Sequence, residues 1–343
     1  MDRKWTVPTV LAAAVWLFAA LAVPEVALYF PGGAEYVWVS PAPAPVSAPT
    51  PRTSPSPAPA PEVTVSPVPE TAPDPSPTPA PSSAPEAGAD GPEIRSFTDS
   101  AAVALRSFTS FDIDADTLSR APLSQRLPSE GPQILVVHTH GTEAYLPVPG
   151  EEYDASDPYR TTDREHSVIR VGDVLCAALE EQGLTVIHDR GIYDYPSYTG
   201  SYARSQAAVE GWLAEYPGIG IVIDLHRDAV GSDRVIYKSL ARTEEPAAQV
   251  MLVVGTGENG LDHPRWRENL ALALAVQRSL DADGRDLARP VRLVRERYNQ
   301  HLSAGAFILE IGTNANTLSE AERAAELFAQ TAGPLFLSLV ADD

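Results

Sequence analysis

Short apolar runs, many of them β-branched, recur along the last two-thirds of the chain, separated by segments with helical periodicity. Runs of this kind indicate buried strands, and their alternation with helices predicts a mostly parallel central sheet with helices on both faces, an α/β fold. Strands are predicted at about 133–139, 184–188, 219–225, 251–255, 291–295 and 306–311, and helices at about 164–182, 200–215, 264–281 and 318–340.

Three of these runs end in side chains that could bind a metal or move a proton. They end in His138-Thr-His140, in Asp224-Leu-His226 and in Glu310-Ile-Gly. Ligands of open α/β sheets bind beyond the carboxyl ends of the strands, so all three runs should deliver these side chains to one rim. Two histidines and a carboxylate, with a further glutamate nearby, are the make-up of a catalytic zinc site.

The two histidine pairs predict different roles for their members. His140 follows the strand end and is expected to bind the metal, whereas His138 is a weaker ligand candidate that could instead support one. His226 is expected to be a ligand, and Asp224, two residues earlier, could hold its imidazole tautomer. The next two residues could form a local ion pair or meet substrate carboxylates: Arg227 and Asp228.

The carboxylate ligand is open between two residues at the start of the first large helix. Asp163 and Glu165 are both candidates, because the amino ends of such helices face the same rim. Thr162 and Glu165 also have the spacing of a capping box, which is a purely structural explanation.

Glu310 is the expected general base. It lies inside an otherwise apolar run, where an acidic group must be paired or close to solvent. Desolvation beside an activated water would suit a base. The alternative is a structural ion pair with Arg295 or Arg297.

The first third of the chain has a different composition. Residues 1–30 begin with Arg3 and Lys4 before an uncharged apolar stretch, which predicts a membrane anchor with a cytoplasmic N-terminus; a cleaved signal peptide is the alternative. Residues 31–92 are rich in Pro, Ala and Ser and predict a disordered, extended linker. Residues 93–130 form a poorly defined prelude, with a short helix near 100–108 and an edge strand near 111–114. Residues 131–343 form the predicted catalytic domain.

The formal net charge of −21 argues against a nucleic-acid partner, because phosphate contacts need clustered Lys and Arg. Tyr198-Thr-Gly-Ser-Tyr202 opens the second predicted helix and could line a groove for a polymer.

Six blocks in the order of the chain resemble the stage II sporulation protein P family. The similarity extends over about residues 131–341, and the anchor and linker fit the family layout. The blocks are His138-Thr-His140-Gly-Thr-Glu143-Ala-Tyr145, Tyr159-Arg-Thr-Thr-Asp163 with Val171-Gly172-Asp173, Tyr198-Thr-Gly-Ser-Tyr202-Ala-Arg-Ser205, Ile223-Asp-Leu-His226-Arg-Asp228, Trp266-Arg-Glu-Asn269 and Leu309-Glu310-Ile-Gly-Thr-Asn314-Ala-Asn316.

The resemblance implies an amidase-like fold and a zinc-dependent N-acetylmuramoyl-L-alanine amidase, with endopeptidase activity on peptide cross-links. It further implies a role in septal thinning and engulfment at the septal or forespore membrane, with peptidoglycan as substrate and stage II sporulation proteins D and M as partners. The amidase pattern maps onto His140, Asp163 or Glu165, His226 and Glu310 in this sequence.

Two other functions remain open from the sequence. One is a different cell-wall metallohydrolase, such as a deacetylase, and the other is a peptidoglycan-binding module without turnover.

Overall fold

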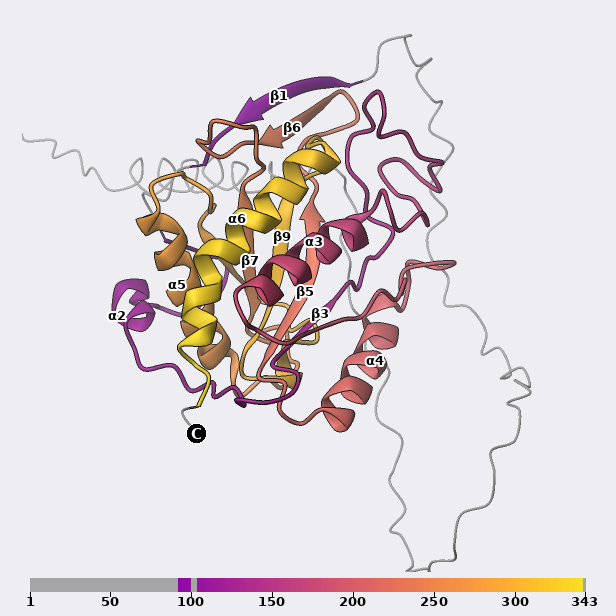
Figure 1. The fold of residues 1–343 in the computed structure, drawn as a ribbon. Coiled ribbons are helices and arrows are strands. Elements are labelled where there is room, and N and C mark those ends of the chain that lie inside the picture. Colours follow the sequence, from indigo (N-terminus) through magenta and orange to yellow (C-terminus); the bar gives the residue numbers. More distant parts are fainter. Residues whose placement is uncertain (1–91, 100–103, 342–343) are drawn as a thin grey trace, which may run out of the picture. The chain divides into compact units, whose positions relative to one another are not determined.

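The computed structural model describes residues 92–99 and 104–341 (Figure 1). The predicted anchor at 1–30, and the predicted linker up to residue 91, lie outside the described residues. Among the residues that are described, no helix combines the length and the apolar character needed to cross a bilayer.

A seven-stranded sheet forms the centre of the described fold, with the strand order β2-β8-β7-β9-β5-β3-β4. All six predicted strands are present. The strands are β2 Leu105–Ser107, β3 Ile134–Val137, β4 Val186–His188, β5 Ile221–Asp228, β7 Val250–Gly255, β8 Val291–Val294 and β9 Ala306–Thr313.

Every neighbouring pair in this sheet is parallel except β7 with β9, so the sheet is mixed, though mostly parallel as predicted. The exception follows from the connection between β5 and β7. That connection contains β6 (Val235–Ser239) but no described helix, and a parallel return needs a crossover to the other end of the sheet. The chain therefore re-enters at the carboxyl end of β5 and runs in the opposite direction.

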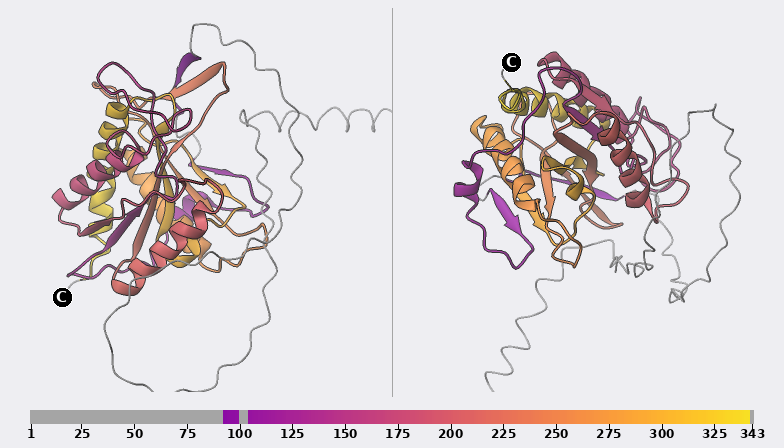
Figure 2. Two further views of the ribbon diagram at one scale, coloured as in Figure 1. Left: turned by 90° about the vertical axis from the view of Figure 1, so that its right-hand side faces the viewer. Right: turned by 90° about the horizontal axis from the view of Figure 1, so that it is seen from below.

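Four helices cover the two faces of the sheet, as predicted (Figures 1 and 2). They are α3 Val168–Glu181, α4 Ser201–Glu215, α5 Trp266–Ala282 and α6 Leu318–Leu337. The larger core lies between the sheet and α3, α5 and α6 and includes Ile223 and Leu309. A smaller cluster joins Val209 of α4 to Leu135 and Val222 on the opposite face. Successive residues of a strand belong to opposite clusters, as Val222 and Ile223 do on β5, and the members of the smaller cluster are the side chains that face α4.

The prelude differs from its prediction. Residues 105–107 form the edge strand β2, which pairs with β8, where a helix was predicted. No strand forms at 111–114, because Asp114 instead caps the short helix α2 (Ala115–Ser119). The strand β1 (Glu93–Phe97) pairs in parallel with β6 as a separate two-stranded sheet. The one described 3-10 helix is η1 (Gln300–Leu302).

Candidate active site

The three chemistry-bearing strands are neighbours in the sheet. β5 lies between β3 and β9, and all three are parallel, so their carboxyl ends meet at one rim as predicted. His226 and Glu310 are directly opposite each other in the register of β5 and β9. The register shifts between His226 and Asp228, so the strand is irregular at the point where the site begins.

His226 is buried between two carboxylates. Its Nδ1 lies 3.4 Å from an oxygen of Glu143, and its Nε2 lies 3.0 Å from an oxygen of Asp224, although without hydrogen-bond geometry. Burial alone would lower the pKa of this imidazole, but Asp224 and Glu143 outweigh burial and raise the pKa well above its usual value. The structure thus brings Asp224 beside His226, as the sequence predicted.

His140 faces His226 from the turn after β3. The centres of the two rings are 5.2 Å apart and nearly perpendicular. Tyr198, just before α4, stacks on His140, and its hydroxyl is hydrogen-bonded to Nε2 at 2.9 Å. The other nitrogen, Nδ1, has no hydrogen-bond partner and lies 3.9 Å from Asp194. Burial lowers the pKa of His140 to about 3, so the ring is neutral and able to bind a metal.

Glu310 completes the rim from β9. Its Oε2 is shut off from solvent and has no hydrogen-bond partner. Burial raises its pKa to about 8, His226 opposes the rise, and Asp228 and Glu143 add to it. The ion pairs with Arg295 or Arg297 that would explain a buried glutamate structurally are not formed.

Glu143 is the buried carboxylate that sequence reasoning did not assign. It lies one turn after His140, and its backbone N–H donates to the carbonyl of His140 at 3.0 Å. Its side chain accepts the N–H of Arg227 and approaches His226. Burial would raise its pKa, but Arg227 and His226 lower it well below the usual range, so Glu143 is an anion. Glu143 lies in a turn, where hydrophobic periodicity gives no information. The signal that could have identified it was its place in the block His138–Tyr145, which also contains His140.

The two predicted carboxylate ligands lie elsewhere. Asp163 and Glu165 precede α3, which begins at Val168 with Ser167 as its N-cap, so the predicted capping box is absent. Asp163 accepts a hydrogen bond from His166 at 2.8 Å, and Glu165 pairs with Arg190. Both side chains are about half exposed, and no contact joins either to His140 or His226.

His138 belongs to a hydrogen-bonded chain beside the rim. On a straight strand His138 and His140 would share a face, but β3 ends at Val137 and the two rings diverge. Nδ1 of His138 contacts the carbonyl of Leu225 at 3.1 Å, and its Nε2 contacts His188 at 2.8 Å. His188 in turn contacts Asp173 of α3 at 3.0 Å. This series of hydrogen bonds links α3 and β4 to Leu225, the residue before His226.

Arg227 and Asp228 are both engaged within the protein. The guanidinium of Arg227 donates to the carbonyls of Ala144 and Tyr159. Asp228 forms an ion pair with Arg289 at 2.8 Å. Their contacts hold the loops of the rim together, and the predicted pair between Arg227 and Asp228 is not formed.

The donors at this rim fit zinc in kind. Among the described residues, no three His, Cys, Asp or Glu side chains are already arranged around a common metal position. His140 nevertheless carries a buried ring nitrogen, Nδ1, without a hydrogen bond, and Nδ1 of His226 faces the Glu143 anion at 3.4 Å. Two imidazoles and a carboxylate are a donor set that zinc uses in catalytic sites.

The fold and the site define an α/β protein whose parallel strands bring two histidines and several buried carboxylates to one edge. The model of the family "Stage II sporulation protein P" matches residues 91–332, and the chain belongs to that family. The expectation from the sequence is therefore confirmed at the level of the family.

The chain is similar to stage II sporulation protein P of Bacillus subtilis (strain 168), with 28% identity over 218 residues. The match covers 59% of this chain and 51% of that protein, so the chain spans about half the length of this curated relative.

Three solved N-acetylmuramoyl-L-alanine amidases have low overall similarity to this chain. The amidase of Mycobacterium smegmatis has a TM-score of 0.36 and 11% identity, over 62% of this chain and 99% of that one. The amidase of Clostridium difficile 630 has a TM-score of 0.35 and 15% identity, over 61% and 97%. The amidase of Nostoc punctiforme has a TM-score of 0.34 and 12% identity, over 61% and 98%.

Proposed function

We propose that the chain is a zinc-dependent peptidoglycan hydrolase of sporulation, which cuts the amide between N-acetylmuramic acid and the L-alanine of the stem peptide. The observation that carries the proposal is the grouping of Glu310 with two imidazoles and the Glu143 carboxylate at one sheet edge. Family membership supports the role in sporulation.

His140, His226 and Glu143 would hold the zinc ion. Glu143 takes the place of Asp163 or Glu165, because of these three carboxylates only Glu143 adjoins a candidate histidine. Bound zinc supplies Lewis-acid activation of water and of the attacked carbonyl. Its charge would also favour the carboxylate form of Glu310, whose pKa burial otherwise raises to about 8.

The chain's own residues then perform the proton transfers. Glu310, as carboxylate, accepts a proton from the attacking water and passes it to the leaving nitrogen of L-alanine. Asp224 keeps the His226 ring in place through the 3.0 Å contact and is itself fixed by two hydrogen bonds from Thr139. Thr142 and Arg160 hold Asp194 against the His140 side of the rim.

The location and partners belong to the same proposal. We expect residues 1–30 to anchor the protein in the septal or forespore membrane, with the catalytic domain outside the cytoplasm and residues 31–92 as a spacer. Stage II sporulation proteins D and M are the expected partners, and cleavage of peptide cross-links would be a second activity of the same site.

The deciding experiment is mass spectrometry of the soluble products after the zinc-loaded full chain acts on purified peptidoglycan, with Glu310→Gln as control. Stem peptides with a free L-alanine amino terminus, absent in the control, are the expected result. Released acetate would instead identify a deacetylase. Binding to the wall without any product, by a zinc-loaded and folded protein, would identify a binding module and refute the proposal.

A further inference from the structure

Arg292 lies on β8 near the rim and has no ion-pair partner among the described residues. It forms no side-chain hydrogen bond or ion pair with any described residue, and its guanidinium lies 5.1 Å from the centre of the Phe108 ring. The other arginines around the site are engaged: Arg160 with Asp194, Arg227 with carbonyls, and Arg289 with Asp228.

Strand register places Arg292 on the same face as Glu310. Arg292 pairs with Val253 of β7, and Val253 pairs with Ile308 of β9, two residues before Glu310. Paired residues share a face, as do residues two apart, so both side chains project to the face that carries α4. Two strands across and two residues along put their Cα atoms about 12 Å apart.

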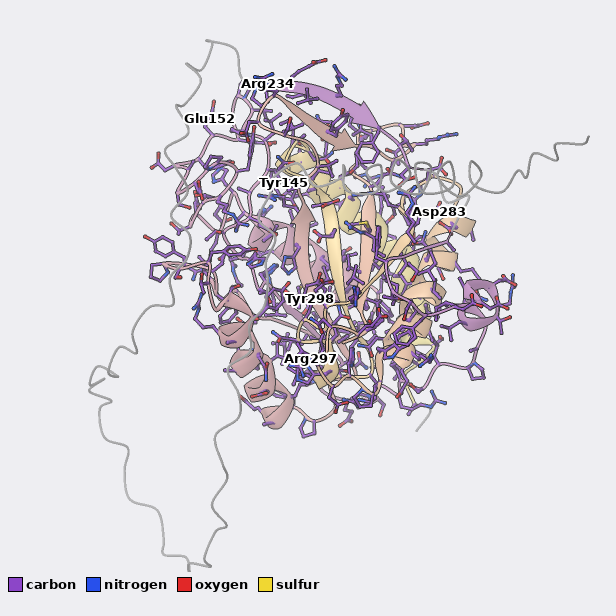
Figure 3. The ribbon with its side chains drawn as sticks, turned by 180° about the vertical axis from the view of Figure 1, so that it is seen from behind. Tyr145, Glu152, Arg234, Asp283, Arg297 and Tyr298 are labelled. Carbon is purple, nitrogen blue, oxygen red and sulfur yellow. The ribbon has the colours of Figure 1, made fainter. Side chains whose placement is uncertain are left out.

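The surroundings of Tyr298 confirm this placement. Tyr298 packs on Val253, Val294 and Ile308, and Figure 3 shows it over the strands beside α4. Burial raises the pKa of Tyr298, and the charges of Glu310 and Arg292 act on it in opposite directions. The charge of Arg292 also reaches Glu310, where it favours the carboxylate. Arg292, Tyr298 and Glu310 therefore lie on the same face of the sheet.

An unpaired, half-buried guanidinium in a chain with a net charge of −21 is suited to an anion supplied by a ligand. Arginine binds carboxylates through two parallel hydrogen bonds, and the Phe108 ring fixes its plane. An extended peptide advances about 3.5 Å per residue, so a carboxylate on the second residue beyond the cut amide lies about 7 Å from it. The side chains of Arg292 and Glu310 can span the rest of the distance of about 12 Å between their Cα atoms.

We propose that Arg292 binds the free carboxylate on the second residue of the substrate's peptide, and so determines which peptides are accepted. The inference rests on the proposed function and gives Arg292 one role in it: to distinguish a free carboxylate from a carboxamide at the position after alanine. Ion pairing by Arg292 orients that peptide across β7 toward Glu310.

The test measures binding and turnover separately in the zinc-loaded full chain. The ligands are two muramoyl tripeptides with amidated carboxyl termini, whose second residue bears either the free carboxylate or the carboxamide. Equilibrium binding is measured in the Glu310→Gln background, with and without Arg292→Gln. The matched control is Arg278→Gln, an exposed arginine on α5.

We expect the carboxylate ligand to bind about 10- to 100-fold more tightly than the carboxamide, and Arg292→Gln to abolish that difference. Arg292→Lys should retain part of it, and Arg278→Gln all of it. Equal binding of both ligands, or a preference that survives in a folded Arg292→Gln protein, would overturn the inference. Failure of the proposed function gives a different result: no cleavage of either ligand by protein with native Glu310, whatever the binding preference.

Discussion

Gly172 on α3 packs against His138 and His188, which are hydrogen-bonded to each other beside the rim. Replacing Gly172 with alanine should destabilise the protein. A Cβ there would lie 2.6 Å from Nε2 of His188 and 2.7 Å from Nε2 of His138. His138 is fully buried and both rings are hydrogen-bonded, so neither can retreat freely. Overpacking of this kind costs about 3 kcal/mol at the upper end of its usual range. Alanine in a helix returns about 1 kcal/mol, which leaves a net loss of about 2 kcal/mol.

The matched control is Gly211 in α4, which is also helical, but a Cβ added there would have nothing within 4 Å. Gly211→Ala should therefore gain about 1 kcal/mol. Urea denaturation followed by circular dichroism measures the change in the free energy of unfolding for both variants. In thermal denaturation, the melting temperatures should move about 4–8 °C down for Gly172→Ala and about 2–4 °C up for Gly211→Ala. If Gly172→Ala were as stable as the native chain, the close packing on the histidine pair would be refuted.

Three further outcomes are expected. Glu310→Gln should keep its zinc and lose about 10²- to 10⁴-fold in turnover of peptidoglycan, measured by product release; undiminished turnover would remove Glu310 from the chemistry. Glu143→Gln should weaken zinc affinity about 100-fold or more in a competition titration, while Glu165→Gln leaves it unchanged; the reverse result would restore Glu165 as the ligand. His263 is buried without a hydrogen bond, and burial lowers its pKa from 6.5 to about 4. Its neutral form therefore stabilises the fold above pH 6.5, and this stabilisation is lost as the pH falls toward 4, because the unfolded chain binds the proton first. His263→Leu should flatten this part of the stability profile in urea titrations at several pH values, and an unchanged slope would contradict the assignment.

The rim of the site could be predicted from the sequence because it depends on strand direction alone. His140, His226 and Glu310 each follow or end an apolar run, and parallel strands bring such ends together. The structure confirms that β3, β5 and β9 are neighbours. No pairing partner had to be known for that conclusion.

The start of α3 could not be predicted, because several residues there are able to cap a helix and differ little in energy. Tertiary contacts decide between them. The side chain of Thr161 donates to the carbonyl of Asp154, and Arg164 donates to the carbonyl of Arg190, so this segment is held as a turn and Ser167 becomes the cap. The same contacts direct Asp163 and Glu165 away from the rim.

Pairing between distant segments accounts for the other differences. β1 and β2 are short strands that depend on β6 and β8, far away in the sequence, and their own residues show little alternation. The reversed direction of β7 depends on where its connection runs, which periodicity does not encode. Glu143 likewise lies in a turn after β3, where no helical or strand periodicity could predict its position.

The position of β9 in the sheet has a consequence for synthesis of the protein. It is the last strand of the sheet to be made, yet it lies in the middle, with β5 on one side and β7 on the other. Until residue 313 has been translated, those two strands have no common neighbour and the sheet remains in two halves. Glu310 arrives with that final strand. A chain that ends before β9 therefore contains the histidines without the base, and the complete site can form only after this strand has been made.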